Sequence, residues 1–467
     1  MDDICFLSAK SIAELIRRRQ VSSQEVVEAY FERVDEVNPS LNAIVRTDRD
    51  RAIGQALDAD NVLRASDTVG PLHGVPFTVK DNIETEGVVC SCGTEGLRNN
   101  VPSVDAIVVS RIRDAGGILI GKTNVPELGM GYETHNRVYG RTNNPYDLTR
   151  TCGGSSGGEA SIIASGGSAV GICTDGGGSA RWPAHCCGLA GFKPTTGRTP
   201  KIGHVPPPGG MLNSLWQISV MARYVEDIPL CLNVICGRDA EDPSTEAMPL
   251  ELSEIIPVKQ LRIAYYMDNG IVSPNTEVSD VVQTCVDQLA SSGAKIVKDR
   301  PPAIDKSHEI YYRLMSSDGG LGVRDLLKSW GTQEIHQYTQ LSLDAQNGRA
   351  IDADGMAGLM NEWDLFQREL NKFSQEYDAI ICPVSTSPAT THGDTYTNQK
   401  YPGFAEMFSY MMAFNLLGWP CGTVRAGTSQ NGLPIGVQVA GGPWQEGIVI
   451  SILKHLESIE GWARPAL

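Results

Sequence analysis

The sequence lacks the features that mark membrane, exported and nucleic-acid-binding proteins. Nowhere do about 18 apolar residues follow one another, and the N-terminal MDDICFLSAKSIAELIRRRQ has acidic residues where a signal peptide has basic ones, and no apolar core. No run of Lys or Arg is long enough to follow a nucleic acid or an anionic membrane, and the formal net charge is −16. We therefore expect a cytoplasmic protein with no nucleic-acid or membrane partner.

The twelve cysteines lack the spacing of a metal site or a disulfide framework. No CxxC pair occurs, and no His cluster completes a four-ligand set around Cys90 and Cys92 or around Cys186 and Cys187. A chain of 467 residues without an export signal keeps its thiols reduced. We expect free, mostly buried thiols and no metal.

Short apolar runs alternate with helical stretches along the chain, which is typical of an α/β protein. Residues 8–37 predict two helices, the second opened by Ser22 and Glu25 in capping-box spacing. Buried strands are predicted at VPFTVK, ILIGKTN, SAVGICTD and, later, at residues 261–266, 379–383 and 434–441. We expect the later strands to extend the sheet that the earlier ones begin.

Three polar residues stand where a tight backbone would present them to a cleft. Lys80 ends the run VPFTVK, where burial would lower its pKa and make it available as a base. Ser155 lies among the glycines of TCGGSSGGEA, which allow unusual backbone dihedrals. Ser179 follows the glycines of TDGGGSARWPA, whose N–H groups are suited to an oxyanion hole. Taken singly, each also fits a strand end reaching solvent or a Gly-rich turn.

Two competing motifs are disfavoured by their context. GGILIGKT at 116–123 satisfies the P-loop pattern, but ILI is itself a predicted strand, whereas a P-loop follows one. No G-x-S-x-G elbow surrounds Ser179, which disfavours an α/β-hydrolase with a histidine base. The histidines near these motifs are therefore expected to be structural or to line a pocket; they are His73, His135, His185 and His204.

Five motifs, in order, resemble those of the amidase signature family. They are GVPFTVKDNI around Lys80, GKTNVPE, CGGSSGGEA, TDGGGSARWPA and GFKPTTGR. NLLGWP and GLPIGVQVAG resemble the C-terminal part of that family. The resemblance covers nearly the whole chain, most densely between residues 70 and 200. It implies an α/β fold with a large mixed central sheet covered by helices on both faces, and an enzyme that hydrolyses a carboxylic amide without a cofactor.

The resemblance also implies a role for each residue of the site. Ser179 would be the nucleophile, Ser155 the bridging serine in a cis peptide, and Lys80 the proton acceptor. The oxyanion hole would consist of the N–H groups of Gly176, Gly177, Gly178 and Ser179. The residues that hold the loops would be Ser156, Thr174, Asp175 and Arg181. A neutral Lys80 would take a proton from Ser155 and Ser155 one from Ser179, leading to an acyl-enzyme.

One domain is expected over residues 1–467, because no internal repeat divides the chain. Within it we expect a helical wrap in residues 1–60, a catalytic core in 65–230, and a variable half in 238–467. The variable half would complete the sheet and the substrate pocket.

Substrate choice is predicted from the segment ELGMGYETHN, which by similarity faces the acyl group. Met130, Gly131 and Tyr132 would bind substrate, and since none is charged we expect an apolar or aryl acyl group, with esters or hydrazides as further substrates. Met130 and Tyr132 are equally well explained as core residues. The aromatic-rich region 305–350 would cap the pocket through Tyr311, Tyr312, Met315 and Trp330.

Three alternatives stay open. One is the glutaminase subunit of a tRNA-dependent amidotransferase, which needs a partner protein; the stretch PPPGGM at 206–211 differs from what we expect of that subunit. Another is an allophanate or carboxybiuret hydrolase. The third is a non-catalytic binding module, which the presence of Lys80, Ser155 and Ser179 disfavours. A homodimer is compatible with the family.

Overall fold

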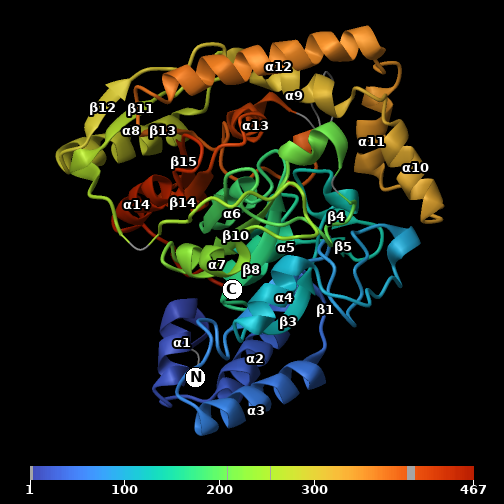
Figure 1. Cartoon of the computed structure of the whole chain (residues 1–467), viewed down its shortest axis with the longest axis vertical. Coiled ribbons are helices and arrows are strands. Elements are labelled where there is room, and N and C mark those ends of the chain that lie inside the picture. The colour runs from blue at the N-terminus through green and yellow to red at the C-terminus, as the bar shows by residue number, and fades with distance from the viewer. Residues whose placement is uncertain (1–3, 208, 253, 397–404) are drawn as a thin grey trace.

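The computed structural model describes residues 4–207, 209–252, 254–396 and 405–467 (Figure 1). Within these residues, fourteen α-helices alternate with fifteen strands. The strands are β1 (Ile44–Arg46), β2 (Pro76–Lys80), β3 (Ile118–Thr123), β4 (His135–Asn136), β5 (Gly140–Arg141), β6 (Asn143–Asn144), β7 (Asp147–Thr151), β8 (Val170–Asp175), β9 (Ala190–Lys193), β10 (Gln217–Ala222), β11 (Arg262–Tyr265), β12 (Lys295–Lys298), β13 (Ala379–Pro383), β14 (Cys421–Thr428) and β15 (Pro434–Gly441). The helices are α1 (Ala9–Arg17), α2 (Ser23–Leu41), α3 (Arg49–Ala65), α4 (Ile107–Asp114), α5 (Gly157–Ala164), α6 (Arg181–Cys187), α7 (Asp227–Ile235), α8 (Thr276–Ser291), α9 (Ser307–Met315), α10 (Leu321–Ser329), α11 (Gln337–Gln346), α12 (Ala353–Phe373), α13 (Ser409–Leu416) and α14 (Glu446–Glu457).

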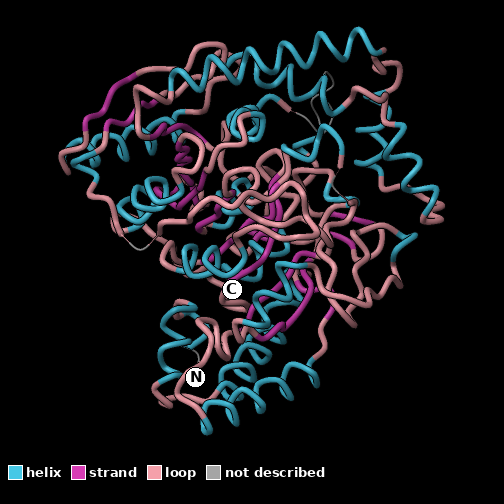
Figure 2. Tube along the Cα trace, in the orientation of Figure 1, coloured by secondary structure: helices cyan, strands magenta, loops and turns pink. Residues whose placement is uncertain are grey.

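One mixed sheet of eleven strands runs through the molecule in the order β1-β3-β2-β8-β10-β9-β14-β15-β13-β11-β12 (Figure 2). β2 lies parallel to both β3 and β8, and β11 lies parallel to β12 and β13. The other neighbouring strands are antiparallel. Strands from both halves of the chain therefore share one sheet, as the sequence predicts, and the predicted α/β fold with a large mixed sheet is confirmed.

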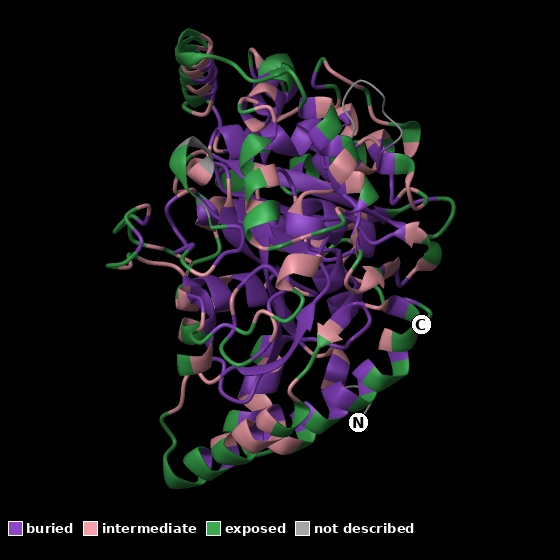
Figure 3. Ribbon diagram, turned by 90° about the vertical axis from the view of Figure 1, so that its right-hand side faces the viewer, coloured by how far each residue is buried: buried purple, intermediate pink, exposed green. Residues whose placement is uncertain are grey.

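Alternating side chains along the strands build a separate core on each face of the sheet. Phe77 and Val79 of β2 pack into one core, with apolar residues of α4, α7, α8 and α14. On the other face, Cys173 of β8 and Cys382 of β13 join apolar residues of α5, α6, α9, α12 and α13. Helices thus cover both faces, and the inner strands β2, β8, β10, β9, β15 and β13 consist only of buried residues (Figure 3).

The N-terminal helices close the β1–β3 edge of the sheet. Helix α2 begins with the predicted capping box, in which Ser22 Oγ accepts from the Glu25 N–H and the Glu25 carboxylate accepts from the Ser22 N–H. The C-terminal tail reaches the same helices, since Arg33 donates to the carbonyl of Leu467 and Phe6 stacks on Trp462. The two ends of the chain are joined by these contacts.

Two further features match the sequence analysis. Of residues 116–123, which satisfy the P-loop pattern, 118–123 form the buried strand β3 and not a loop after a strand. The cysteines are free thiols, and all except Cys236 are buried. Burial raises the pKa of most of these thiols, Cys90 to about 12 for example, which keeps them protonated and unreactive. In the part of the chain that the structure describes, no helix is long and apolar enough to cross a lipid bilayer.

We predict that Phe77→Ala lowers the free energy of unfolding by about 3–5 kcal/mol, because it leaves a cavity in a core that Phe77 fills at 1% exposure. Urea unfolding followed by tryptophan fluorescence measures this change. Leu148→Ala, at a side chain that is 41% exposed, is the matched control and should stay within about 0.5 kcal/mol of the parent. Equal midpoints for the two variants would contradict the assignment of Phe77 to the core.

Candidate active site

The polar residues of the site lie where two parallel neighbouring strands end. Lys80 is the last residue of β2, and Thr174 and Asp175 are the last two of β8. Since β2 and β8 are parallel and adjacent, their carboxyl ends open at the same edge of the sheet. This arrangement brings together residues 94 positions apart in the chain, and Lys80 Nζ donates to Thr174 Oγ1 at 2.8 Å.

Two short loops carry the serines into the same space. Ser155 and Ser156 precede α5, and Ser179 stands just before α6. The peptide bond between Gly154 and Ser155 is cis. Ser156 ties the loops together, because its N–H donates to the Ser179 carbonyl at 3.2 Å and its hydroxyl donates to the Thr174 carbonyl at 3.2 Å. The positive ends of both helices therefore face the serines.

Lys80 is enclosed by hydroxyl groups. Its Nζ lies 2.6 Å from Ser155 Oγ and 2.8 Å from Thr174 Oγ1, and the side chain is fully buried. Burial lowers the pKa of Lys80 to about 8, because the charged ammonium loses the hydration it has in water. A substantial fraction of this lysine is thus neutral near pH 8 and can accept a proton from Ser155.

A fully buried ion pair between Asp175 and Arg181 holds the glycine loop. Arg181 donates through Nε and Nη2 to the two carboxylate oxygens, at 2.9 and 2.8 Å. Burial by itself would raise the pKa of Asp175, but the guanidinium holds it well below its usual range. Asn415 and Gln438 complete the network, since Asn415 bonds to both members of the pair and Gln438 accepts from Arg181.

Asp175 also fixes the backbone of the loop that precedes the helix. Its carboxylate accepts from the N–H groups of Gly178 and Ala180, at 2.8 and 3.1 Å. Gly178 has a φ of +115°, and a Cβ there would lie 2.5 Å from Met411 Sδ, so only glycine fits. The Gly178 N–H, one of the donors predicted for the oxyanion, thus donates to Asp175 in this structure.

Two tyrosines hold the other glycines of the loop. Tyr132 donates to the Gly177 carbonyl at 2.9 Å, and Tyr311 donates to the Gly176 carbonyl at 2.8 Å. The Tyr132 ring stacks on Phe408 with 3.6 Å between ring centroids. These contacts fix the orientation of the peptide groups that join Gly176 to Gly177 and Gly177 to Gly178.

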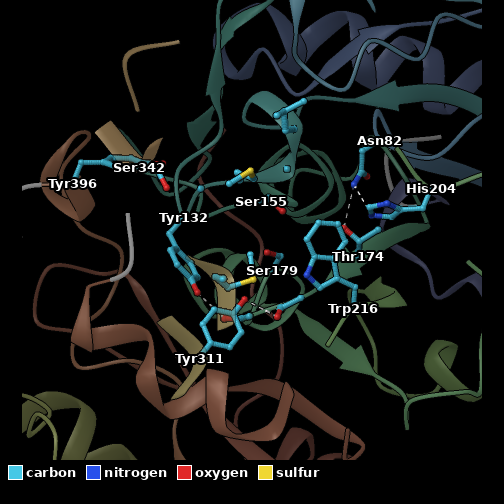
Figure 4. Close-up of a pocket in the computed structure, with 17 residues that line it drawn as sticks. Asn82, Tyr132, Ser155, Thr174, Ser179, His204, Trp216, Tyr311, Ser342 and Tyr396 are labelled. Atoms are coloured by element: carbon cyan, nitrogen blue, oxygen red, sulfur yellow. Dashed lines mark hydrogen bonds between the residues drawn. The ribbon is translucent and has the colours of Figure 1, made fainter. Parts of the chain in front are cut away.

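Ser155, Thr174 and Ser179 line one pocket, together with Gly176, Gly177 and the two tyrosines that hold them (Figure 4). Figure 4 shows Tyr132, Ser342 and Tyr396 on one side and Asn82, Thr174, His204 and Trp216 on the other, with Ser155 and Ser179 between them. The remaining described residues of the lining are Leu128, Gly129, Met130, Gly131, Gly176, Gly177, Tyr311 and Met315. None of the described lining residues is Asp, Glu, Lys or Arg.

A family model described as Amidase matches residues 25–450. The chain belongs to the amidase family. Two relatives and one solved structure show how broad this family is. The chain is 31% identical to a glutamyl-tRNA(Gln) amidotransferase subunit of Carboxydothermus hydrogenoformans, with full coverage of both chains. It is 33% identical to an acylamidase of Rhodococcus erythropolis, over 98% of this chain and 96% of the relative.

The structural comparison gives the same fold. The 6-aminohexanoate cyclic dimer hydrolase, solved in complex with its substrate, superposes with a TM-score of 0.88 at 25% identity, covering 99% of each chain. The protein is therefore an amidase signature enzyme that cleaves amide bonds.

The structure of this amidase brings together most of the residues that the sequence singles out. Met130, Gly131 and Tyr132 line the pocket, as do Tyr311 and Met315 from the region expected to cap it. Tyr312 and Trp330 of that region are not among the described lining residues: Tyr312 donates to the Ala345 carbonyl, and Trp330 packs against Leu327 and other apolar residues. Of the four histidines, His204 lines the pocket, whereas His185 is buried between backbone groups of Ser387 and Gly436.

Several residues of the site were missed by the sequence analysis. Asn415 lies in NLLGWP and Gln438 in GLPIGVQVAG, each a polar residue inside a buried apolar run. Such an interruption is the signal that could have identified them, because buried polar groups need partners. Asn82 and Trp216 carry no comparable signal, since their place at the pocket depends on the packing of distant loops.

We predict that Arg181→Met lowers the free energy of unfolding by about 3–5 kcal/mol, because it leaves the Asp175 carboxylate buried without its cation. Arg18→Met, at an arginine side chain that is 69% exposed, is the control and should change stability by less than about 1 kcal/mol. Thermal or urea unfolding of the parent and both variants measures these changes in the free energy of unfolding. An Arg181→Met variant as stable as the control would show that the pair does not hold the loop.

Proposed function

We propose that this amidase hydrolyses uncharged carboxylic amides through an acyl-enzyme, with Ser179 as nucleophile, Ser155 as bridging serine and Lys80 as base. The observation that carries the proposal is the 2.6 Å contact between Lys80 Nζ and Ser155 Oγ in a fully buried setting. The lowered pKa of Lys80 supports it, because an ammonium could not accept a proton.

The proposed reaction moves one proton along the chain of three residues. Ser155 gives its proton to neutral Lys80 and takes one from Ser179, whose oxygen then bonds to the carbonyl carbon. The relay returns a proton to the nitrogen as the C–N bond breaks, since an amide anion is a very poor leaving group. Water then attacks the ester of Ser179 by the same relay and releases the acid. Apart from this water, the proposed steps use only Ser179, Ser155 and Lys80.

The developing oxyanion is proposed to bind the N–H groups of Gly176, Gly177 and Ser179. Two tyrosines and the Asp175–Arg181 pair fix this loop before substrate arrives. Donors fixed in advance stabilise transition-state charge without a reorganisation cost during the reaction. Ser156 and Thr174 are proposed to support the site by joining the two serine loops and Lys80.

The described lining of the pocket favours an apolar or aryl acyl group. Met130, Tyr132, Tyr311 and Met315 present apolar or aromatic surface, and no described lining residue carries a full charge at neutral pH. His204 is neutral as well, because burial lowers its pKa to about 4. A charged substrate would lose its hydration here without gaining an opposite charge.

The same observation weighs against two alternatives. Glutamine carries an ammonium and a carboxylate, and allophanate and carboxybiuret each carry a carboxylate. The described lining of the pocket offers no oppositely charged side chain to any of these groups. The relative from Carboxydothermus hydrogenoformans, named as part of a glutamyl-tRNA(Gln) amidotransferase, keeps the partner-dependent glutaminase as a second candidate. We propose that this chain acts on small-molecule amides without a partner protein.

Ser179→Ala should lower kcat/KM by at least about a thousandfold on every amide that the parent cleaves, because the proposed acyl-enzyme forms on the Ser179 hydroxyl. Amine release from a panel of aryl, fatty and small polar amides, with glutamine and allophanate included, measures this and ranks the substrates.

The exposed serine variant Ser66→Ala is the control and should keep parental activity. Undiminished turnover in Ser179→Ala would reject the proposed nucleophile. A parent enzyme that cleaves only glutamine, and only with a partner protein present, would favour the glutaminase alternative.

The pH profile tests the proposed base. Because neutral Lys80 is the active form and its pKa lies at about 8, kcat/KM should rise tenfold per pH unit below 8 and level off above it. Initial rates between pH 6 and 10, with circular dichroism to confirm folding, measure the profile. A profile that falls between pH 7 and 9, or one with no change there, would exclude a neutral lysine as the base.

A further inference from the structure

Trp216 stands opposite the first glycine of the loop before Ser179, because the register of the sheet places it there. β10 begins at Gln217, which pairs in antiparallel register with Asp175, the last residue of β8. One step beyond this pair, Trp216 faces Gly176. A Cβ on Gly176 would lie 2.5 Å from Cδ1 and 2.7 Å from Nε1 of the indole. The ring therefore packs directly against the Gly176 backbone.

The indole N–H of Trp216 is a donor that is open to the pocket. Trp216 is half-buried and lines the pocket, and no group among the described residues accepts from its Nε1. This nitrogen is not enclosed, in contrast to Nε1 of Trp462, which is buried and also lacks an acceptor among those residues. Figure 4 shows the nitrogen edge of the Trp216 ring turned toward Ser179. A substrate in the pocket can therefore accept from it.

Backbone donors without acceptors lie on the same loop. In the part of the chain that the structure describes, the N–H groups of Gly176, Gly177 and Ser179 donate to no other group, whereas the Gly178 N–H donates to Asp175. Free donors that surround a nucleophile are suited to the oxygen of the carbonyl group that it attacks. The loop thus offers the oxygen fewer backbone donors than its glycines could supply.

Trp216 Nε1 lies close enough to these donors to share one acceptor with them. Because it would be 2.7 Å from a Cβ on Gly176, its distance from the Gly176 nitrogen is at most roughly 5 Å. One oxygen atom at about 2.9 Å from each nitrogen can accept from both. Under the proposed function the carbonyl carbon bonds to Ser179 Oγ, so the carbonyl oxygen is the acceptor that comes to this place.

We propose that the Trp216 indole N–H is a further donor of the oxyanion hole and bonds to the carbonyl oxygen of the scissile amide as negative charge develops there. It compensates for the Gly178 N–H, which donates to Asp175. The inference rests on the proposed function, with Ser179 as nucleophile. The indole keeps its proton throughout: charge moves onto the oxygen as Ser179 Oγ bonds to the carbonyl carbon, and returns as the C–N bond breaks.

This role predicts an effect on the reaction rate and not on substrate binding. A hydrogen bond to an anionic oxygen is stronger than one to a neutral carbonyl, so the donor stabilises the transition state more than the bound substrate. The same oxyanion forms twice, once when the acyl-enzyme is made and again when water attacks it. Both steps should therefore depend on Trp216.

The test removes the indole N–H and keeps an aromatic ring over Gly176. Trp216→Phe is assayed on an anilide and on the 4-nitrophenyl ester of the same apolar acid. We expect kcat/KM to fall about 100- to 1000-fold on both substrates, which is the loss typical of one oxyanion-hole donor, while KM for the anilide changes by less than about threefold. Stopped-flow measurement of the ester burst separates acylation from deacylation, and both rate constants should fall.

Three further proteins complete the experiment. Trp462→Phe removes an indole N–H that has no acceptor among the described residues and lies in the C-terminal tail, and it should keep the parental rates. Ser179→Ala should lose turnover and burst together. The analogue 3-benzothienylalanine at position 216 replaces the indole N–H by sulfur with little change of shape, and should show the same losses even where Trp216→Phe fails to fold.

Parental rate constants for both steps would overturn the role of Trp216 and leave the proposed nucleophile intact. A loss confined to acylation would overturn it as well, because it would assign the indole to the leaving group, which has departed before deacylation. A change in KM alone would show that the ring only shapes the pocket. Turnover that persists in Ser179→Ala would overturn the proposed function and this inference with it.

Discussion

The buried ion pair between Asp175 and Arg181 is the interaction on which the rest of the site depends. The Asp175 carboxylate orients the glycine loop before Ser179, and the Arg181 guanidinium reaches residues of α13 and β15 in the second half of the chain. A buried pair of this kind is tolerated only when its other hydrogen-bonding positions are filled, and here they are. One electrostatic contact thus ties the loop before Ser179 to both halves of the sheet.

The ion pair and Lys80 show opposite effects of burial at the ends of two neighbouring strands. Arg181 keeps the charge of Asp175, because the guanidinium replaces the lost hydration. Among the described residues, Lys80 has hydroxyl groups and no carboxylate at hydrogen-bonding distance, so burial lowers its pKa. The fold therefore maintains one permanent charge pair and one amine with a lowered pKa, and the difference lies in whether a counter-ion is in contact.

Family membership leaves the substrate open, because relatives with such different names share the fold. In this chain none of the described lining residues of the pocket is Asp, Glu, Lys or Arg. Tyr132 and Tyr396 line one side, and Asn82, Thr174, His204 and Trp216 line the other. The side with the two tyrosines can recognise shape and apolar area.

The sequence by itself determined the fold class, the capping box of α2, the strands at Lys80 and Asp175, and the motifs that place Lys80, Ser155 and Ser179 in one site. These properties are local, because they depend on the spacing of apolar residues, on the capping residues of helices, and on glycines next to a reactive side chain. Only the tertiary structure decided that Asp175 accepts from the Gly178 N–H, that Trp330 packs in the apolar cluster around Leu327, and that Asn82 and His204 line the pocket. Such facts depend on contacts between residues far apart in the chain, and no local pattern records which distant group will fill a given hydrogen bond.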